Sequence, residues 1–237
     1  MRKRFFFVII TALFAVSVVM GQSGNSNKSN SEMSIEESYL QEAIELMIIR
    51  ETTKSGSREQ KFIALEHIGN ALERGSTNDE LRTALEYLCL EGTQNKATMG
   101  GRQISYPDVR RQAARYLSGI VTKESKDSLI RVCISENEPM VLQEAIRSLG
   151  IVGLNDNDDA INAIVRVTEH NLMSTAPDNL VALAALDALD KICTKYKTAT
   201  PTALMLIINI STGPYNRPVQ DLARQVLVNI RKIASKQ

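Results

Sequence analysis

The sequence has no tryptophan, only three cysteines and only two histidines in 237 residues, and aromatic residues make up 5% of it. Three cysteines cannot build the multi-bridged scaffold on which small secreted domains depend. Cys89, Cys133 and Cys193 each lie within an apolar, helix-like pattern. We expect all three to be buried, unpaired thiols that act as small hydrophobic groups. An oxidising compartment would permit the alternative of one bridge and one remaining thiol.

Sites for chemistry are also scarce. His67 and His170 each follow a glutamate, but no second histidine follows four residues later, so the zinc pattern HExxH is missing. The sequence has neither a GxSxG elbow nor a glycine-rich phosphate loop. Asp156, Asp158 and Asp159 lack the glycine and the later glutamate of a calcium loop, so we interpret them as a turn followed by helix-start acids. We therefore predict no catalytic residue, no cofactor and no metal ion, and we expect a protein that is not an enzyme.

The charges are nearly balanced, with 28 basic and 27 acidic residues. Arg2, Lys3 and Arg4 form the one basic cluster that stands out. Loss of residues 1–21 would leave 25 basic and 27 acidic residues. A protein that binds nucleic acid is expected to show a basic excess on one face, so we predict no nucleic-acid partner.

The N-terminal residues have the layout of a secretory signal. Three basic residues precede an uncharged run over 5–21. Val19 and Gly21 provide small side chains three residues and one residue before a cut between Gly21 and Gln22. We expect an exported, periplasmic or extracellular protein. The alternative is an uncleaved membrane anchor, because the run approaches the ~17 residues of a short membrane span.

The remaining chain divides into two parts. Residues 22–33 are nearly all Ser, Asn, Gly and Gln, a composition typical of a flexible polar spacer. Residues 34–237 show helical amphipathic periodicity and no sustained strand-like alternation, which predicts an all-α domain. The predicted helices cover 35–51, 58–73, 78–91, 108–122, 125–135, 138–153, 157–172, 178–195, 201–211 and 217–235.

Several helix starts carry recognisable signals. The capping-box spacing occurs in three pairs, Ser34 with Glu37, Ser57 with Gln60 and Thr77 with Glu80. Prolines stand at or near five starts, where the missing amide hydrogen costs no intrahelical bond. These are Pro107, Pro139, Pro177, Pro201 and Pro218.

An internal repeat is the most informative pattern. Four segments align on an alanine flanked by larger aliphatic residues, namely VRRQAARYLSGI, VLQEAIRSLGIV, VALAALDALDKI and VQDLARQVLVNI, and QKFIALEHIGNA is a weaker fifth. A small residue at the centre of a helix stripe lets a neighbouring helix approach closely. We therefore predict that the repeat alanines are buried between stacked helices. They are Ala64, Ala113, Ala145, Ala185 and Ala223.

The segment DVRRQAARYLSG from Asp108 resembles the first helix of a HEAT repeat, and PMVLQEAIRSLGIVG from Pro139 is similar. The resemblance implies a HEAT-like α-solenoid of about four to five antiparallel helix pairs, with the second helices lining the concave side. Val181 and Val219 depart from the pattern because no arginine follows them. A tetratricopeptide array fits poorly, since tryptophan is absent and the spacing varies. An ordinary helical bundle with alanines at its interfaces remains the alternative.

Two regions are candidates for binding a protein partner. The first is the connection 92–107, where Arg102 and Tyr106 are the side chains best able to anchor a partner. The second is a mixed-charge ridge on the second helices, which we expect to turn outward. An ordinary solvated face has the same composition. The ridge includes Lys126, Arg131, Arg166, Glu169 and His170.

We interpret the chain as an exported scaffold or adaptor that mediates protein–protein interaction in the cell envelope. The alternatives are an enzyme-accessory or ligand-binding protein with an unrecognised site, or a membrane-anchored structural component. The helix 201–211 is apolar almost all around, so we also expect it to be buried on several sides or covered by a partner. Burial between residues 181–196 and the final helix is the simpler interpretation.

Overall fold

The computed structural model describes residues 35–93 and 105–234, and within them it contains ten α-helices and no strand. The predicted all-α class is confirmed, and most helix ends agree with the prediction to within two or three residues. The helices are α1 (Ile35–Lys54), α2 (Arg58–Glu73), α3 (Asp79–Leu90), α4 (Pro107–Leu117), α5 (Lys123–Ser135), α6 (Pro139–Val152), α7 (Asp159–Leu172), α8 (Asn179–Tyr196), α9 (Pro201–Thr212) and α10 (Arg217–Ala234).

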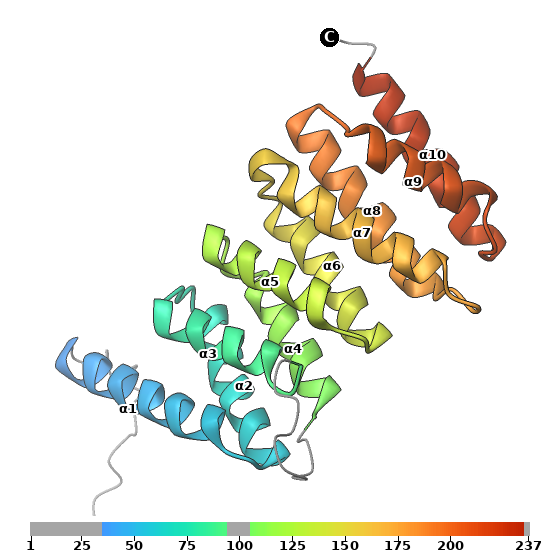
Figure 1. The fold of residues 1–237 in the computed structure, drawn as a ribbon. Helices are drawn as coiled ribbons and strands as arrows, with labels where there is room; N and C mark the ends of the chain where they lie inside the picture. Colours follow the sequence, from blue (N-terminus) through green and yellow to red (C-terminus); the bar gives the residue numbers. More distant parts are fainter. Residues whose placement is uncertain (1–34, 94–104, 235–237) are drawn as a thin grey trace, which may run out of the picture.

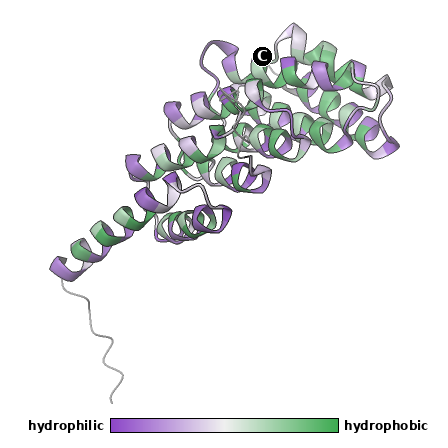
Figure 2. Cartoon of the chain, turned by 60° about the horizontal axis from the view of Figure 1, so that its bottom comes forward, coloured by the Kyte–Doolittle hydropathy of each residue, from purple (hydrophilic) through white to green (hydrophobic). Residues whose placement is uncertain are grey.

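The helices form two layers that run the length of an elongated array (Figure 1). The even-numbered helices α2, α4, α6, α8 and α10 pack side by side in one layer. The odd-numbered helices α1, α3, α5, α7 and α9 form the other, and each packs on the even helix that follows it. Hydrophobic residues gather where the layers meet, and hydrophilic residues face outward (Figure 2). The described residues thus form a solenoid of five helix pairs, within the four to five that the HEAT resemblance implied.

The repeat alanines lie in the core of the array. All five have no solvent exposure, which confirms their predicted burial. Gly150, five residues after Ala145, brings α6 still closer to α8, because a Cβ placed on it would lie 2.7 Å from the Cα of Ala188. Two helices can approach this closely only where neither presents a large side chain. The small residues therefore set the spacing of the even layer.

The starts of the helices confirm some predicted caps and correct another. Ser57 Oγ accepts a hydrogen bond from the Gln60 amide at 3.5 Å, although the Ser57 amide donates to Ser55 Oγ instead of to the Gln60 side chain. The prediction for Thr77 is wrong. Asn78 caps α3, and its Oδ1 accepts from the Glu80 amide at 2.9 Å, consistent with the stronger capping preference of asparagine. Ser34 lies outside the described residues.

Two helix boundaries differ from prediction for local reasons. Helix α4 ends at Leu117, and α5 begins after Thr122, whose Oγ1 accepts from the Ser125 amide at 3.2 Å. Before α7, residues 156–158 form a short 3-10 turn in which Asn157 and Asp158 have positive φ angles of 53° and 61°. Asparagine and aspartate tolerate this left-handed conformation better than other side chains, so the turn delays the start of α7.

The predicted burial of the apolar helix 201–211 is only partly correct. Helix α9 packs chiefly on α10 and α7, and only weakly on α8. It buries Leu206, Ile207 and Ile210, but Met205 and Ile208 are exposed. The physical reason is its position, because α9 is the last odd helix among the described residues and none of the described helices covers its outer side.

Candidate protein-binding surface

A hollow of about 390 Å³ lies between α5, α7 and the start of α6. Its rim includes three side chains that the sequence predicted to face outward, Arg166, Glu169 and His170. Arg166 and His170 lie four residues apart and Glu169 lies three after Arg166, so all three project from one face of α7. The structure therefore brings these three candidates together on one side of the hollow.

The charged side chains on this rim have no partner within the described residues, where no side-chain hydrogen bond or ion pair engages Arg166, Glu169 or His170. Hydrophobic side chains lie beside them. Met173 is 82% exposed and Ile134 is 53% exposed, and both line the hollow. Exposed apolar groups surrounded by unpaired charges are the composition of a protein-binding patch with an apolar centre and a polar rim.

The framework around the hollow is fixed by hydrogen bonds. After α7, the Asn171 side chain donates to the Asp178 carbonyl at 3.1 Å and accepts from the Asp178 amide at 3.0 Å. Asn171 Nδ2 also donates to the hydroxyl of Tyr215 at 3.2 Å. Behind the hollow, the buried Glu136 carboxylate accepts from Arg110 Nε at 2.7 Å. A surface held in this way loses little conformational entropy when a partner binds.

Arg131 faces outward, as predicted, but it is engaged within the protein. Its guanidinium pairs with Glu86 on the neighbouring α3, and it donates to Ser128 Oγ at 3.1 Å. Glu86 also accepts from Arg82 Nη1 at 3.0 Å. Because this network links α3 to α5, a partner would have to compete with it for the charge of Arg131. Arg131 is therefore set apart from the three residues on the rim.

The prediction that Lys126 lies on the same outward ridge is wrong. Its side chain has no solvent exposure, and Nζ donates to Asp156 at 2.8 Å and to Asp159 at 2.5 Å. Burial opposes the charged form, but these two carboxylates outweigh it and raise the pKa of Lys126. The same contacts lower the pKa of Asp156. The predicted turn with helix-start acids is confirmed, and its partner is a lysine that periodicity alone could not identify.

The connection 92–107 is only partly described. Arg102 lies outside the described residues. The Tyr106 side chain is half-buried, and its hydroxyl donates to the carbonyl of Gly56 at 3.0 Å. Tyr106 therefore ties the start of α4 to the turn between α1 and α2.

A groove that the sequence did not indicate lies on the even layer. It has a volume of about 540 Å³ and spans α2, α4 and α6. Arg115 and Arg147 face it, each two residues after a repeat alanine, and Arg111 pairs with Glu144 at 3.5 Å beside them. The recurrence of arginine at one repeat position was a signal that could have indicated this groove.

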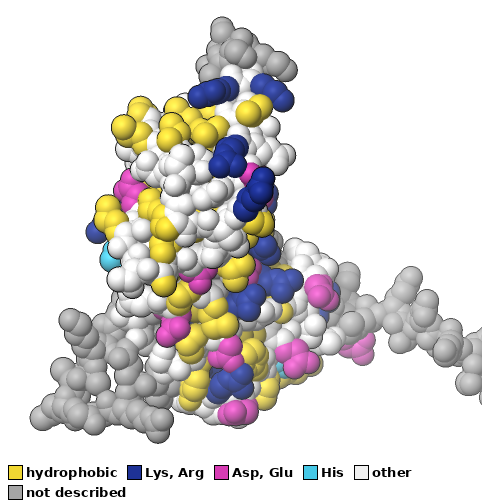
Figure 3. All heavy atoms as spheres, turned by 90° about the vertical axis from the view of Figure 1, so that its right-hand side faces the viewer, with side chains coloured by type: hydrophobic (Ala, Val, Ile, Leu, Met, Phe, Trp, Pro, Cys, Tyr) yellow, Lys and Arg dark blue, Asp and Glu magenta, His cyan; other side chains and the backbone are white. Residues whose placement is uncertain are grey.

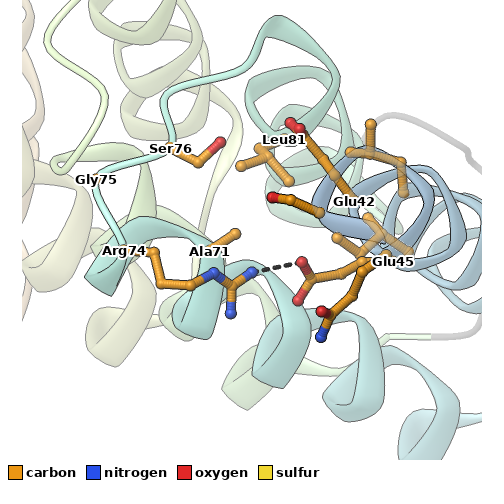
Figure 4. Close-up of a pocket in the computed structure, with 11 residues that line it drawn as sticks. Glu42, Glu45, Ala71, Arg74, Gly75, Ser76 and Leu81 are labelled. Carbon is orange, nitrogen blue, oxygen red and sulfur yellow. Dashed lines mark hydrogen bonds and ion pairs between the residues drawn. The ribbon is translucent and has the colours of Figure 1, made fainter. Parts of the chain in front are cut away.

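A third hollow, of about 440 Å³, lies among α1, α2 and α3 (Figure 4). Glu45 of α1 and Arg74 at the end of α2 point toward one another across it and form an ion pair. His67 Nδ1 lies 3.5 Å from the same carboxylate. Glu45 and Arg74 are therefore already engaged with each other, unlike the three charged side chains on the rim on α7.

The three cysteines are buried and free, as predicted. Burial raises the pKa of Cys133 to about 12 and that of Cys193 to about 11, and it raises the pKa of Cys89 as well. A thiol that stays protonated is a poor nucleophile.

Over residues 35–93 and 105–234, the structure places no three His, Cys, Asp or Glu side chains where they could share a metal ion. None of the helices in those ranges combines the length and apolarity needed to span a bilayer.

Comparison with known families identifies the architecture. The family model for HEAT repeats matches residues 103–171, which run from the start of α4 almost to the end of α7. This segment is similar to HEAT repeats, and the described helices on either side of it continue the same all-α solenoid architecture. The match includes both segments whose sequence resembled a HEAT helix, and it includes the rim on α7. HEAT repeats commonly mediate protein–protein interaction. No curated protein sequence matches the chain.

Proposed function

We propose that this HEAT-like protein is an exported scaffold or adaptor of the cell envelope that binds a protein partner and catalyses no reaction. The observation that carries the proposal is the hollow between α5 and α7, where unpaired Arg166, Glu169 and His170 border the exposed Met173 and Ile134. The shape is a shallow surface hollow, and the nearest thiol, Cys133, is buried and protonated. Such a surface suits a protein segment that contributes one apolar side chain and complementary charges.

The proposed export rests on the N-terminal sequence. Basic residues 2–4 followed by the uncharged run 5–21 favour a cleaved signal, with Gln22 as the first residue of the mature chain. Intact-mass measurement of protein isolated from its host tests this directly. A mass that corresponds to residues 22–237, in the extracytoplasmic fraction, is the expected result. A full-length mass in the membrane fraction would favour the anchored alternative.

The binding surface is tested with a partner isolated by photo-cross-linking from position 173, next to the rim on α7. The affinity of that purified partner is then measured for the wild-type protein and for Arg166→Glu. We expect a loss of at least tenfold, or about 1.4 kcal/mol. Arg147→Glu is the matched control, because it makes the same charge reversal in the groove on the other layer. Equal losses in the two variants would reflect net charge alone, and a loss only in Arg147→Glu would move the binding surface to the groove.

A further inference from the structure

Both ends of the helical array expose apolar side chains. At the first end, α1 leaves Leu40, Ile44 and Met47 exposed along one stripe. At the last end, α9 exposes Ile208 and α10 exposes Val228. Positions 40, 44 and 47 follow helical spacing, so the α1 side chains form one continuous apolar face.

The stripe on α1 occupies the side that internal helices use to contact the helix before them. The buried residues Ile49, Thr52 and Thr53 of α1 repeat in α3 as Leu85, Leu88 and Cys89. In this alignment Ile44 and Met47 correspond to Glu80 and Thr83, which line the space between α3 and α1. Ile44 and Met47 are therefore placed to contact a preceding odd helix, and α1 is the first helix described.

Helix α9 shows the complementary situation. Ile207 and Ser211 occupy the buried positions that Ile164 and Thr168 hold in α7. The residue after Ile164 is Val165, which is 5% exposed, whereas the residue after Ile207 is Ile208, which is 47% exposed. The two positions differ because α7 has α9 beside it, whereas among the described helices no odd helix lies beyond α9. Ile208 is therefore placed to contact a following odd helix.

The even layer ends in the same way. Gly69 and Gly150 each lie five residues after a repeat alanine, and each contacts the next even helix, through Tyr116 and Ala188. The equivalent residue of α10 is Val228, five residues after Ala223, which is 48% exposed. Both layers thus end at α9 and α10 with apolar side chains at positions that are covered elsewhere in the array.

The two ends also carry opposite charge. Helix α1 contains five acidic and two basic side chains, and α10 contains four basic and one acidic. Figure 3 shows Lys and Arg side chains gathered at the C-terminal end of the array beside hydrophobic ones. Complementary charge steers two surfaces together and fixes which surface meets which, while the apolar contacts supply most of the affinity.

We propose that this protein associates head to tail with a second copy of itself, the α9–α10 end of one copy docking on the α1–α2 end of the next. Each copy then continues the helical layers of the previous one. Such a contact joins two different surfaces, so it leaves one end open and extends into a chain or a closed ring of copies.

The test uses the protein as its host processes it and measures its mass in solution by sedimentation velocity over a wide range of concentration. The wild-type mass should rise above that of one chain with increasing concentration, and the rise should weaken at high salt. Ile44→Glu blocks the first end and Ile208→Glu blocks the last end, so each variant alone should be monomeric. An equimolar mixture of the two variants should form a complex of two chains and nothing larger, because only one pair of intact ends remains.

The double variant Ile44→Glu, Ile208→Glu should be monomeric, and Val121→Glu, which alters an exposed apolar residue between α4 and α5, should behave as wild type. Circular dichroism of each variant checks that its helices are intact. A wild-type protein that stays monomeric throughout would overturn the proposal. So would self-association that survives in one single variant, because that result means that like ends pair.

Discussion

The first repeats, which contain α2 and α4, and the later repeats, which contain α6 and α8, all have a buried alanine at the same position. They differ in the residue that lies three positions before this alanine. In α2 and α4 this position holds charged residues, Lys61 and Arg110, whereas in α6 and α8 it holds Leu142 and Ala182. Both cations are buried. The repeat thus accepts either a charge or an apolar side chain at one structural position, provided that the surroundings match.

The surroundings match because an acid follows at the end of the next helix. Lys61 Nζ lies 2.8 Å from Glu91, and it also donates to the Thr53 carbonyl at 3.0 Å. Arg110 Nε lies 2.7 Å from Glu136, whose Oε1 also accepts from the amides of Asn137 and Glu138. In α6, where no cation occupies the position, Leu142 instead lines the hollow between α5 and α7. The repeats of α2 and α4 are therefore closed by ion pairs at the position where α6 offers an apolar side chain to the hollow, and the equivalent Ala182 of α8 is buried.

The largest effect is expected from breaking one of these pairs. Arg110→Met removes the cation but leaves the Glu136 carboxylate buried, with a side-chain exposure of 3%. Removing one partner of a buried pair typically costs ~3–5 kcal/mol because the remaining charge is uncompensated. Urea unfolding followed by circular dichroism measures the loss. Arg50→Met is the matched control, because both members of its pair with Glu80 are exposed, with side-chain exposures of 58% and 48%. For this exposed pair we expect a loss of at most ~1 kcal/mol.

A second substitution distinguishes two causes of this stability loss, the unpaired charge of Glu136 and the lost packing of the Arg110 side chain. Adding Glu136→Gln to Arg110→Met removes the buried charge but keeps an oxygen that accepts from the amides of Asn137 and Glu138. We expect the double variant to regain more than half of the lost stability. If the double variant regains none of the lost stability, the loss arises from packing around the substituted side chain on α4. The difference between the repeats would then not be caused by the ion pair.

Lys126 joins the two regions, because it lies on α5 and binds the turn before α7. Lys126→Met should cost ~1.5–3 kcal/mol, toward the lower end because both carboxylates are partly exposed. The pKa of Asp156 is lowered from 3.8 by its contact with Lys126. The contribution of this ion pair to folding stability is therefore fully present above pH 3.8 and is lost as pH falls through the lower pKa of the folded state. The pKa of Lys126 is raised from 10.5, so its contribution is lost only as pH rises through that higher value.

The difference in unfolding free energy between wild type and Lys126→Met should therefore be constant from about pH 5 to 10 and should shrink in more acidic solution. Chemical unfolding at a series of pH values measures it. A difference that persists unchanged well below the folded pKa of Asp156 would show that the lysine acts through its aliphatic chain instead.

A smaller effect distinguishes the two regions at the glycine five residues after the alanine. A methyl group on Gly150 would meet the Ala188 backbone, which cannot move without separating α6 from α8. On Gly69 it would meet the Tyr116 hydroxyl at 2.6 Å, the end of a side chain that can rotate away. Gly150→Ala should cost ~1–2 kcal/mol, as overpacking outweighs the better helix propensity of alanine. Gly69→Ala should change thermal stability by less than half as much, and a reversed order would contradict this account.

The sequence was sufficient to predict the fold because the repeat alanines, the prolines at helix starts and the apolar periodicity are local signals. Ala145 and Pro139 can be interpreted from their neighbours alone. The partner of Arg110 could not be predicted, because Glu136 lies at the end of another helix and nothing near either residue specifies the contact. Lys126 was assigned to the surface for the same reason. For Arg110 one signal was available in the sequence, because a cation also occupies the same repeat position in α2.

The candidate surface was only partly predictable. The shared face of Arg166, Glu169 and His170 follows from helical spacing, so the sequence could group them. The sequence could not show that Ile134 and Met173, from different segments, lie beside them, or that Arg131 is held by Glu86. The contacts that separate a binding surface from a solvated face are contacts between helices, and these appear only when the helices are stacked.

The buried thiols test whether the two regions also unfold separately. Cys89 and Cys133 occupy equivalent positions on α3 and α5, and Cys193 lies on α8. Denatured, unreduced protein should titrate as three thiols, and fewer would indicate a bridge. In folded protein, labelling requires local opening. Stability in repeat arrays is mainly a sum over neighbouring repeats, so Arg110→Met should speed labelling of Cys89 and Cys133 but leave the rate at Cys193 nearly unchanged. Equal acceleration at all three, measured by peptide mass spectrometry, would mean that the array opens as a single unit and that the difference between its regions is confined to the folded state.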